Sequence, residues 1–123
     1  MGRNSFRIQV GQRGCYAAID LDVSFKEMQD EKGLSINYNG DERWKLACEA
    51  GIHIFYDYFR KPGRFEVTIN DVAWLPVDTS FLIVMYATAE ALAKELDYKI
   101  PGLKFDKLNE VFIFPEYRAA IEL

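Results

Sequence analysis

Few side chains in this sequence have the chemistry of a nucleophile, a general base or a metal ligand. His53 is the only histidine, and it falls on the polar side of a predicted helix, opposite the apolar stripe. The only cysteines, Cys15 and Cys48, fall on a predicted strand and on an apolar helix face, which favours buried free thiols over a disulfide or a metal pair. No Cys–His or Ser–His–Asp arrangement follows from these positions. We therefore expect no catalytic residues, no metal and no cofactor.

Two other features could carry chemistry and are better explained without it. Asp20 and Asp22 alternate on one face of a predicted strand and could hold a cation, but a solvated outer face explains the same pattern. The turn before the second predicted helix carries Trp74, Leu75 and Pro76, where a phosphate-binding loop would carry glycines. We therefore expect neither kinase activity nor a cation site.

Two predicted loops are candidates for binding a macromolecule. Trp74 and Leu75 either mark a contact site, because large apolar side chains on a polar-flanked loop are costly to expose, or fold back as a satellite of the core. Arg13, in the glycine-flanked turn of the first hairpin, either contacts RNA or is solvated. The candidate macromolecule-binding residues at these two tips are Gln12, Arg13, Asp71, Trp74 and Leu75.

Alternating and helical patterns predict the elements that position these loops. Period-two alternation predicts strands over Ser5–Val10, Cys15–Phe25, Leu34–Tyr38, Arg64–Asn70 and Glu110–Phe114. A helix is predicted from Asp41, as its cap, to the turn at Pro62, with Gly51 in the middle of a stripe that faces the sheet. The order β-β-β-α-β-α with a short C-terminal strand indicates an α+β fold, a two-layer sandwich with two helices on one sheet face.

The second helix is predicted from Asp78, as its cap, to about Leu96. It is apolar on two sides. Phe81, Leu82, Met85, Tyr86, Ala89, Leu92 and Leu96 form the predicted core face, and Ile83, Val84, Ala87 and Ala91 form a second strip. A helix that is apolar on both sides is buried on both sides, so we expect the C-terminal segment or a partner chain to cover the second strip.

Length and charge limit the classes of function. The 123 residues fit one domain, 1–123, with a core over about 5–97 and a C-terminal extension over 98–123. The formal net charge of −4 counts against general nucleic-acid binding. No charged-then-apolar leader is seen, and the apolar run Phe81–Ala87 is far shorter than the ~20 residues of a membrane span. We therefore expect a cytoplasmic protein without membrane contact.

Three local motifs occur in a characteristic order. The stretch 11–16, Gly-Gln-Arg-Gly-Cys-Tyr, is similar to a Gly-x-Gly-x-Tyr or Phe hairpin, and 47–52, Ala-Cys-Glu-Ala-Gly-Ile, is similar to an Ala-Val-Glu-x-Gly-Ile helix. The stretch 77–80, Val-Asp-Thr-Ser, is similar to a Val-Asp-Ser-Ser segment before an alanine-rich helix. Together with a strand-like match at 110–114, these motifs resemble domain IV of the translation elongation factor G family, which has a ribosomal protein S5 domain 2-like fold. The resemblance implies a left-handed βαβ crossover, which the general preference for right-handed connections disfavours.

The resemblance also implies a function. In that family the join before the second helix lies at the domain's tip, enters the ribosomal decoding site and bears Asp-Gly-Ser-Tyr-His. This chain has Asp-Val-Ala-Trp-Leu at 71–75, so the glycine and the histidine are absent. The resemblance implies a non-enzymatic binding module, standing alone without the GTPase, whose partner is the ribosome or RNA.

A second hypothesis is a protein–protein interaction module on the same fold, with no ribosome role. It could be an inhibitor, an immunity-type protein or a homodimer. The acidic charge and the absent tip histidine favour this hypothesis, whereas the arginines near the N-terminus favour the ribosome. The two hypotheses predict different surfaces, because a basic tip would suit RNA and an apolar or acidic tip would suit a protein.

Overall fold

The computed structural model describes residues 2–10, 13–29, 32–59, 62–77, 79–98, 104–106 and 111–113. Its elements are, in chain order, β1 (Gly2–Val10), β2 (Arg13–Glu27), β3 (Lys32–Tyr38), α1 (Lys45–Tyr58), β4 (Gly63–Ala73), α2 (Phe81–Glu95), β5 (Lys104–Asp106) and β6 (Val111–Ile113). The predicted order β-β-β-α-β-α with a short C-terminal strand is confirmed. The first four strands extend beyond their predicted bounds, and β5 was not predicted.

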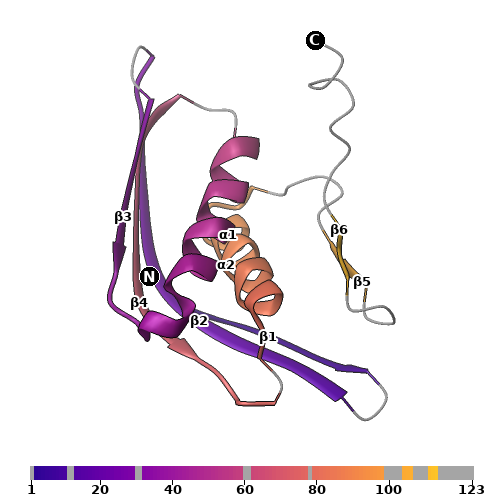
Figure 1. Cartoon of the computed structure of the whole chain (residues 1–123). Coiled ribbons are helices and arrows are strands. Elements are labelled where there is room, and N and C mark those ends of the chain that lie inside the picture. Colours follow the sequence, from indigo (N-terminus) through magenta and orange to yellow (C-terminus); the bar gives the residue numbers. More distant parts are fainter. Residues whose placement is uncertain are drawn as a thin grey trace.

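Strands β1 to β4 form one mixed sheet in the order β1-β2-β4-β3, and β5 and β6 form a separate antiparallel pair. The hairpin β1–β2 and the pair β2–β4 are antiparallel, with a bulge in β2 between Asp20 and Leu21, whereas β3 and β4 are parallel. Both helices lie on the same face of the sheet (Figure 1). The fold is therefore α+β, with the predicted two layers.

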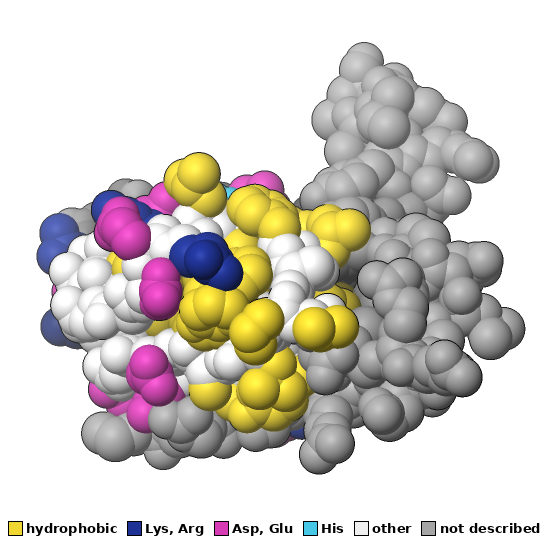
Figure 2. Space-filling model, turned by 60° about the horizontal axis from the view of Figure 1, so that its bottom comes forward, with side chains coloured by type: hydrophobic (Ala, Val, Ile, Leu, Met, Phe, Trp, Pro, Cys, Tyr) yellow, Lys and Arg dark blue, Asp and Glu magenta, His cyan; other side chains and the backbone are white. Residues whose placement is uncertain are grey.

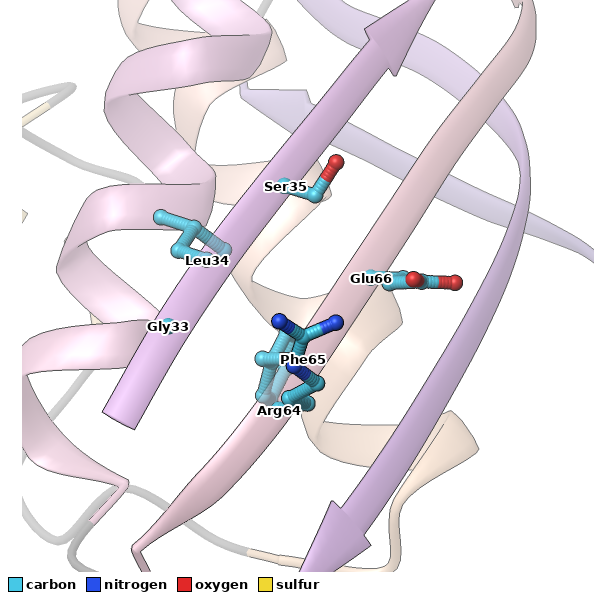
Figure 3. A pocket seen from close by; sticks show the side chains of 6 residues that line it. All are labelled: Gly33, Leu34, Ser35, Arg64, Phe65 and Glu66. Carbon is cyan, nitrogen blue, oxygen red and sulfur yellow. The ribbon is translucent and has the colours of Figure 1, made fainter. Parts of the chain in front are cut away.

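Helix α1 joins the parallel strands β3 and β4, so these three elements form a βαβ crossover. Figure 3 looks at the open face of the sheet. There β4 lies to the right of β3 while β3 runs upward, and the helices lie behind the strands. A crossover with this geometry is left-handed, as the resemblance implied, against the usual preference.

The two helices begin with different kinds of cap. The Asp41 carboxylate accepts the backbone N–H of Arg43 at 2.8 Å and caps a 3-10 turn, Glu42–Trp44, which leads directly into α1. Asp41 is therefore a cap as predicted, but of the 3-10 turn, and α1 itself begins after Trp44 without a side-chain cap. Helix α2 is capped by Ser80, whose hydroxyl oxygen accepts the N–H of Ile83 at 3.4 Å. The cap predicted at Asp78 lies outside the described residues.

Helix α2 is covered on both apolar sides by the fold itself. Ile83, Val84, Ala87 and Ala91 are buried in the main core together with sheet residues such as Leu21 and Ile69. The sheet therefore covers this strip, where the sequence led us to expect the C-terminal segment or a partner chain. The side that carries Met85 and Ala89 lies against α1. In the described part of the chain, no helix is long and apolar enough to cross a membrane.

Gly51 is the point of closest approach between the two helices. A Cβ atom at this position would lie 2.4 Å from the carbonyl oxygen of Met85 and 2.8 Å from Cβ of Thr88. Only a residue without a Cβ allows the helix backbones to approach this closely. The prediction that Gly51 faces the sheet was wrong, because the stripe on α1 is shared between the sheet and α2.

The end of the helix layer where α1 finishes is closed by aromatic rings. Phe59 lies edge-on to Phe25 with ring centroids 4.8 Å apart, and it stacks on Phe55 at 5.3 Å. Phe65 and Tyr98 contact Phe59 at 5.5 and 5.0 Å. Such pairs contribute ~0.5–1.5 kcal/mol each beyond their burial. We call this cluster of Phe25, Phe55, Phe59, Phe65 and Tyr98 the aromatic end.

Candidate functional site

The opposite end of the helix layer gathers segments that are far apart in the sequence. Helices α1 and α2 both begin there, and the β4–α2 connection crosses it (Figure 1). The paired ends of β1 and β2, Val10 and Arg13, reach the same end. A surface at this end can therefore combine residues from four elements.

Hydrogen bonds hold the β4–α2 connection in place. The hydroxyl oxygen of Thr79 accepts the N–H of Leu75 at 2.8 Å, and the N–H of Thr79 donates to the carbonyl of Leu75 at 3.1 Å. The same hydroxyl donates to the carbonyl of Tyr16 in β2 at 2.6 Å. Leu75 and Thr79 are thus tied to each other, and Thr79 is tied to the sheet.

Exposed apolar side chains gather at this end. Five large apolar residues are exposed in the described part of the chain: Leu46 at 69%, Leu75 at 45%, Val77 at 86%, Phe81 at 46% and Leu82 at 43%. They come from the first turns of the two helices and from the connection between β4 and α2. Figure 2, which looks at this end, shows hydrophobic side chains spread across it with a basic side chain among them. We call these five residues the helix-end patch.

A small aromatic and cationic cluster lies beside the helix-end patch. Trp74 is half-buried and packs edge-on against the buried Trp44, with ring centroids 5.6 Å apart. The guanidinium carbon of Arg43 lies 4.4 Å from the Trp74 ring centroid, a cation–π distance. Trp74 is therefore a satellite of the core, whereas Leu75 is exposed. The core-satellite alternative therefore holds for Trp74, while Leu75 stays a candidate contact residue.

Carboxylates near Tyr38 belong to the same segments as this cluster, since Asp41 and Glu42 precede Arg43 and Asp71 precedes Trp74. Burial raises the pKa of Tyr38, and the Cys48 thiol and the carboxylates of Asp41, Glu42 and Asp71 raise it further. Three acidic side chains therefore lie near one tyrosine at the end of β3. In its described part, this end combines exposed apolar side chains with the carboxylates of Asp41, Glu42 and Asp71 and the basic side chains of Arg43 and Lys45.

The predicted site residues are divided between loop and strand. Asp71 lies in β4, paired in register with Asp20, and not in a loop. Arg13 is the first residue of β2 and pairs with Val10 at the end of the hairpin, while Gln12 lies outside the described residues. Only Trp74 and Leu75 lie in the β4–α2 connection, because β4 continues to Ala73.

Most of the helix-end patch was missed from the sequence. Phe81 and Leu82 were assigned to the core face of their helix, but they are exposed, and the main core instead buries Ile83 and Val84 of the same turn. Leu46 gave a usable signal, because it is a large apolar residue outside the predicted stripe of its helix. Nothing in the local pattern marked Arg43, which is placed by its contact with Trp74.

The residues weighed for catalysis are in unsuitable surroundings. Burial raises the pKa of the Cys48 thiol to about 11, so the thiol is protonated near neutral pH and unreactive. His53 is exposed on α1. Asp22 accepts a hydrogen bond from the side-chain amide of Asn70 at 3.1 Å. Within the described residues, no three acidic, histidine or cysteine side chains gather as a metal site would require.

A hollow of about 230 Å³ lies at the far edge of the sheet and is lined by Gly33, Leu34, Ser35, Arg64, Phe65 and Glu66. Figure 3 shows that Ser35, Arg64 and Glu66 project from β3 and β4 on the open face. Ligand pockets are usually larger, ~300–1,000 Å³, and are lined mainly by apolar side chains. This hollow has no convergent catalytic groups, and we do not assign a ligand to it.

Comparisons with known proteins bear on the fold. No family model matches the chain, and no curated protein matches its sequence. Among solved structures, the crystal structure of a Thermus thermophilus protein is similar, with a TM-score of 0.54 and 21% sequence identity. The match covers 72% of this chain and 14% of that chain. At this identity the likeness shows the fold alone, and it agrees with the α+β architecture described above.

Proposed function

We propose that this protein is a non-enzymatic binding module that engages another protein through the helix-end patch. The observation that carries this proposal is the gathering of the exposed large apolar side chains of the described residues at one end of the molecule. Contiguous apolar surface rimmed by polar residues is typical of protein interaction sites. An apolar and partly acidic end is the surface that the protein–protein hypothesis predicts.

We also propose that the fold is related to domain IV of the elongation factor G family. The left-handed crossover and the order of elements support this relation. The resemblance makes the ribosome a second candidate partner, and one contact favours it. Arg43 stacked on Trp74 is an arrangement that can also receive a nucleotide base. The three carboxylates beside this cluster count against an RNA partner, because they repel phosphate.

A site-specific photo-crosslinking experiment tests the first proposal. A photoreactive phenylalanine analogue replaces Val77, the most exposed residue of the helix-end patch, and a matched variant carries it at Asp57, an exposed position on α1. We expect a discrete protein adduct from position 77 in cells, absent from position 57 and lost when Leu82→Ser is added. Equal labelling at both positions would contradict the proposal.

Co-sedimentation with purified ribosomes at low and moderate salt tests the second candidate. Salt-sensitive pelleting that is lost in Trp74→Ala and Arg13→Gln variants would support the ribosome. A protein that stays in the supernatant at both salt concentrations would exclude it, because phosphate contacts strengthen steeply as salt falls.

A further inference from the structure

Arg43 has an unusual position for a charged side chain. Its guanidinium lies on the face of Trp74, at the end of the molecule that carries the helix-end patch. Among the described residues, this guanidinium has a ring contact and no carboxylate within ion-pair distance. Asp41 and Glu42 are close in sequence, but neighbours one and two positions away on a helical turn do not face each other. The Asp41 carboxylate instead accepts the backbone N–H of Arg43.

A partner that covers the helix-end patch would remove water from this guanidinium. A charge that is buried without a counter-charge opposes binding, whereas a charge that meets a carboxylate in bidentate geometry adds specificity and strength. Stacking on Trp74 also holds the planar guanidinium in one orientation, so less freedom is lost when a carboxylate binds it. The partner surface must therefore provide a negative group at this point.

We infer that the partner of the helix-end patch is a protein segment with apolar side chains and a carboxylate that pairs with Arg43. This inference rests on the proposed function and names the chemistry of the partner. A phosphate could also bind a guanidinium. The carboxylates of Asp41 and Glu42 directly before Arg43, and of Asp71 three residues before Trp74, disfavour a polyphosphate chain, because it brings many negative charges, and they tolerate a single carboxylate better.

The intrinsic fluorescence of the protein provides a local readout. Trp44 and Trp74 are the only tryptophans of the chain, and they contact each other next to Arg43. A ligand that reaches Arg43 should change this emission. Titrations can therefore use the full chain without an added label.

The test begins with a phage library of random linear peptides selected against the full-length protein. Peptides that lose binding to a Leu82→Ser variant and to a Val77→Ser variant are kept as ligands of the helix-end patch. Each is synthesised and titrated against the wild type, Arg43→Gln, Arg43→Lys and Lys26→Gln. Lys26 is an exposed residue on β2, and its variant controls for the change in net charge.

We expect the patch-dependent peptides to carry Asp or Glu among apolar residues. Arg43→Gln should weaken their binding by about tenfold or more, Arg43→Lys by less, and Lys26→Gln should have no effect. Replacing the acidic residue of a peptide by its amide should abolish the difference between wild type and Arg43→Gln. This last result would show that the peptide's carboxylate pairs with Arg43. A loss of stability in Arg43→Gln could not produce it, because it would weaken the binding of both forms of the peptide.

Three other outcomes would refute the inference, and they have different consequences for the proposed function. Patch-dependent peptides that lack a carboxylate, or that bind Arg43→Gln as well as wild type, refute the inference and leave the proposed function intact. A selection whose peptides all ignore Leu82→Ser and Val77→Ser refutes both. Fluorescence titration with single-stranded oligouridine that saturates, and that is abolished by Arg43→Gln, assigns Arg43 to phosphate and favours the RNA hypothesis.

Discussion

Phe65 at the aromatic end is 1% exposed, whereas Phe81 at the other end of the helix layer is 46% exposed. Both are large apolar residues near the start of an element, and local sequence does not separate them. At the aromatic end, rings from β2, β4, the end of α1 and Tyr98, three residues after α2, cover one another. At the patch end, Phe81 and Leu82 are exposed while Ile83 and Val84 of the same helical turn are buried, so the neighbouring elements cover only one side of the start of α2. The aromatic end is thus covered by side chains of this chain, whereas the patch end exposes apolar side chains.

The largest effect is expected where the two helices of the layer meet. Gly51→Leu should prevent cooperative folding, because overpacking costs ~1–3 kcal/mol or more and the obstructing atom is the backbone oxygen of Met85, only 2.4 Å from the new Cβ. Thermal unfolding by circular dichroism measures this. Gly33→Ala is a matched control, since nothing lies within 4 Å of its new Cβ. A normal transition for Gly51→Leu would mean that the helices are farther apart.

The comparison itself is tested by the same substitution at both ends. Phe65→Ala should lower the free energy of unfolding by ~3–5 kcal/mol, as expected for a buried phenylalanine. Phe81→Ala should lower it by less than about 1 kcal/mol, because much of its side chain is already in water. Urea denaturation of both variants gives the two values. Equal losses would mean that the patch end is covered in solution, for example by a second copy of the chain.

A smaller effect distinguishes the two neighbours in the β4–α2 connection. Trp74→Ala should cost ~1–2 kcal/mol of stability, because it removes an aromatic contact with Trp44 and a cation–π contact with Arg43. Leu75→Ser should change stability by less than about 0.5 kcal/mol, since the residue is exposed. The same denaturation experiment serves for both. If Leu75→Ser is the more damaging substitution, the connection has a different conformation in solution.

The smallest expected effect is a pH dependence of stability that comes from the buried thiol of Cys48. Cys48 lies one helical turn beyond Trp44, and burial raises the pKa of its thiol to about 11. The unfolded state loses this proton near pH 9, so the stability contributed by the neutral thiol is complete below that pH and is lost as pH rises towards 11. The loss should be about 1 kcal/mol at pH 10.

Urea denaturation of wild type and Cys48→Ala between pH 8 and 10 should show a shallower decline for the variant, on the order of this difference. Cys15 is present in both proteins, so its own effect on the pH dependence cancels in the comparison. Rapid reaction of Cys48 with a thiol reagent in the native state would show that the interior opens at this point.

The sequence by itself determined the order of elements, the two-layer class and the cap at Asp41, because alternation, helical periodicity and capping are local properties. It also predicted a contact surface at the β4–α2 connection, which stays a prediction. Its motifs, through a family resemblance, anticipated the left-handed crossover, which composition alone would not have predicted.

Only the tertiary structure decided which apolar residues are covered. The strip of Ile83, Val84, Ala87 and Ala91 is buried by the sheet, Gly51 faces α2, and Phe81 and Leu82 are exposed although they belong to the predicted core face. A helical wheel gives the direction of each side chain around its own axis, but not which of these directions the other elements cover. Burial depends on what the other elements place in each direction, which is why the helix-end patch and the position of Arg43 on Trp74 appear only in the folded chain.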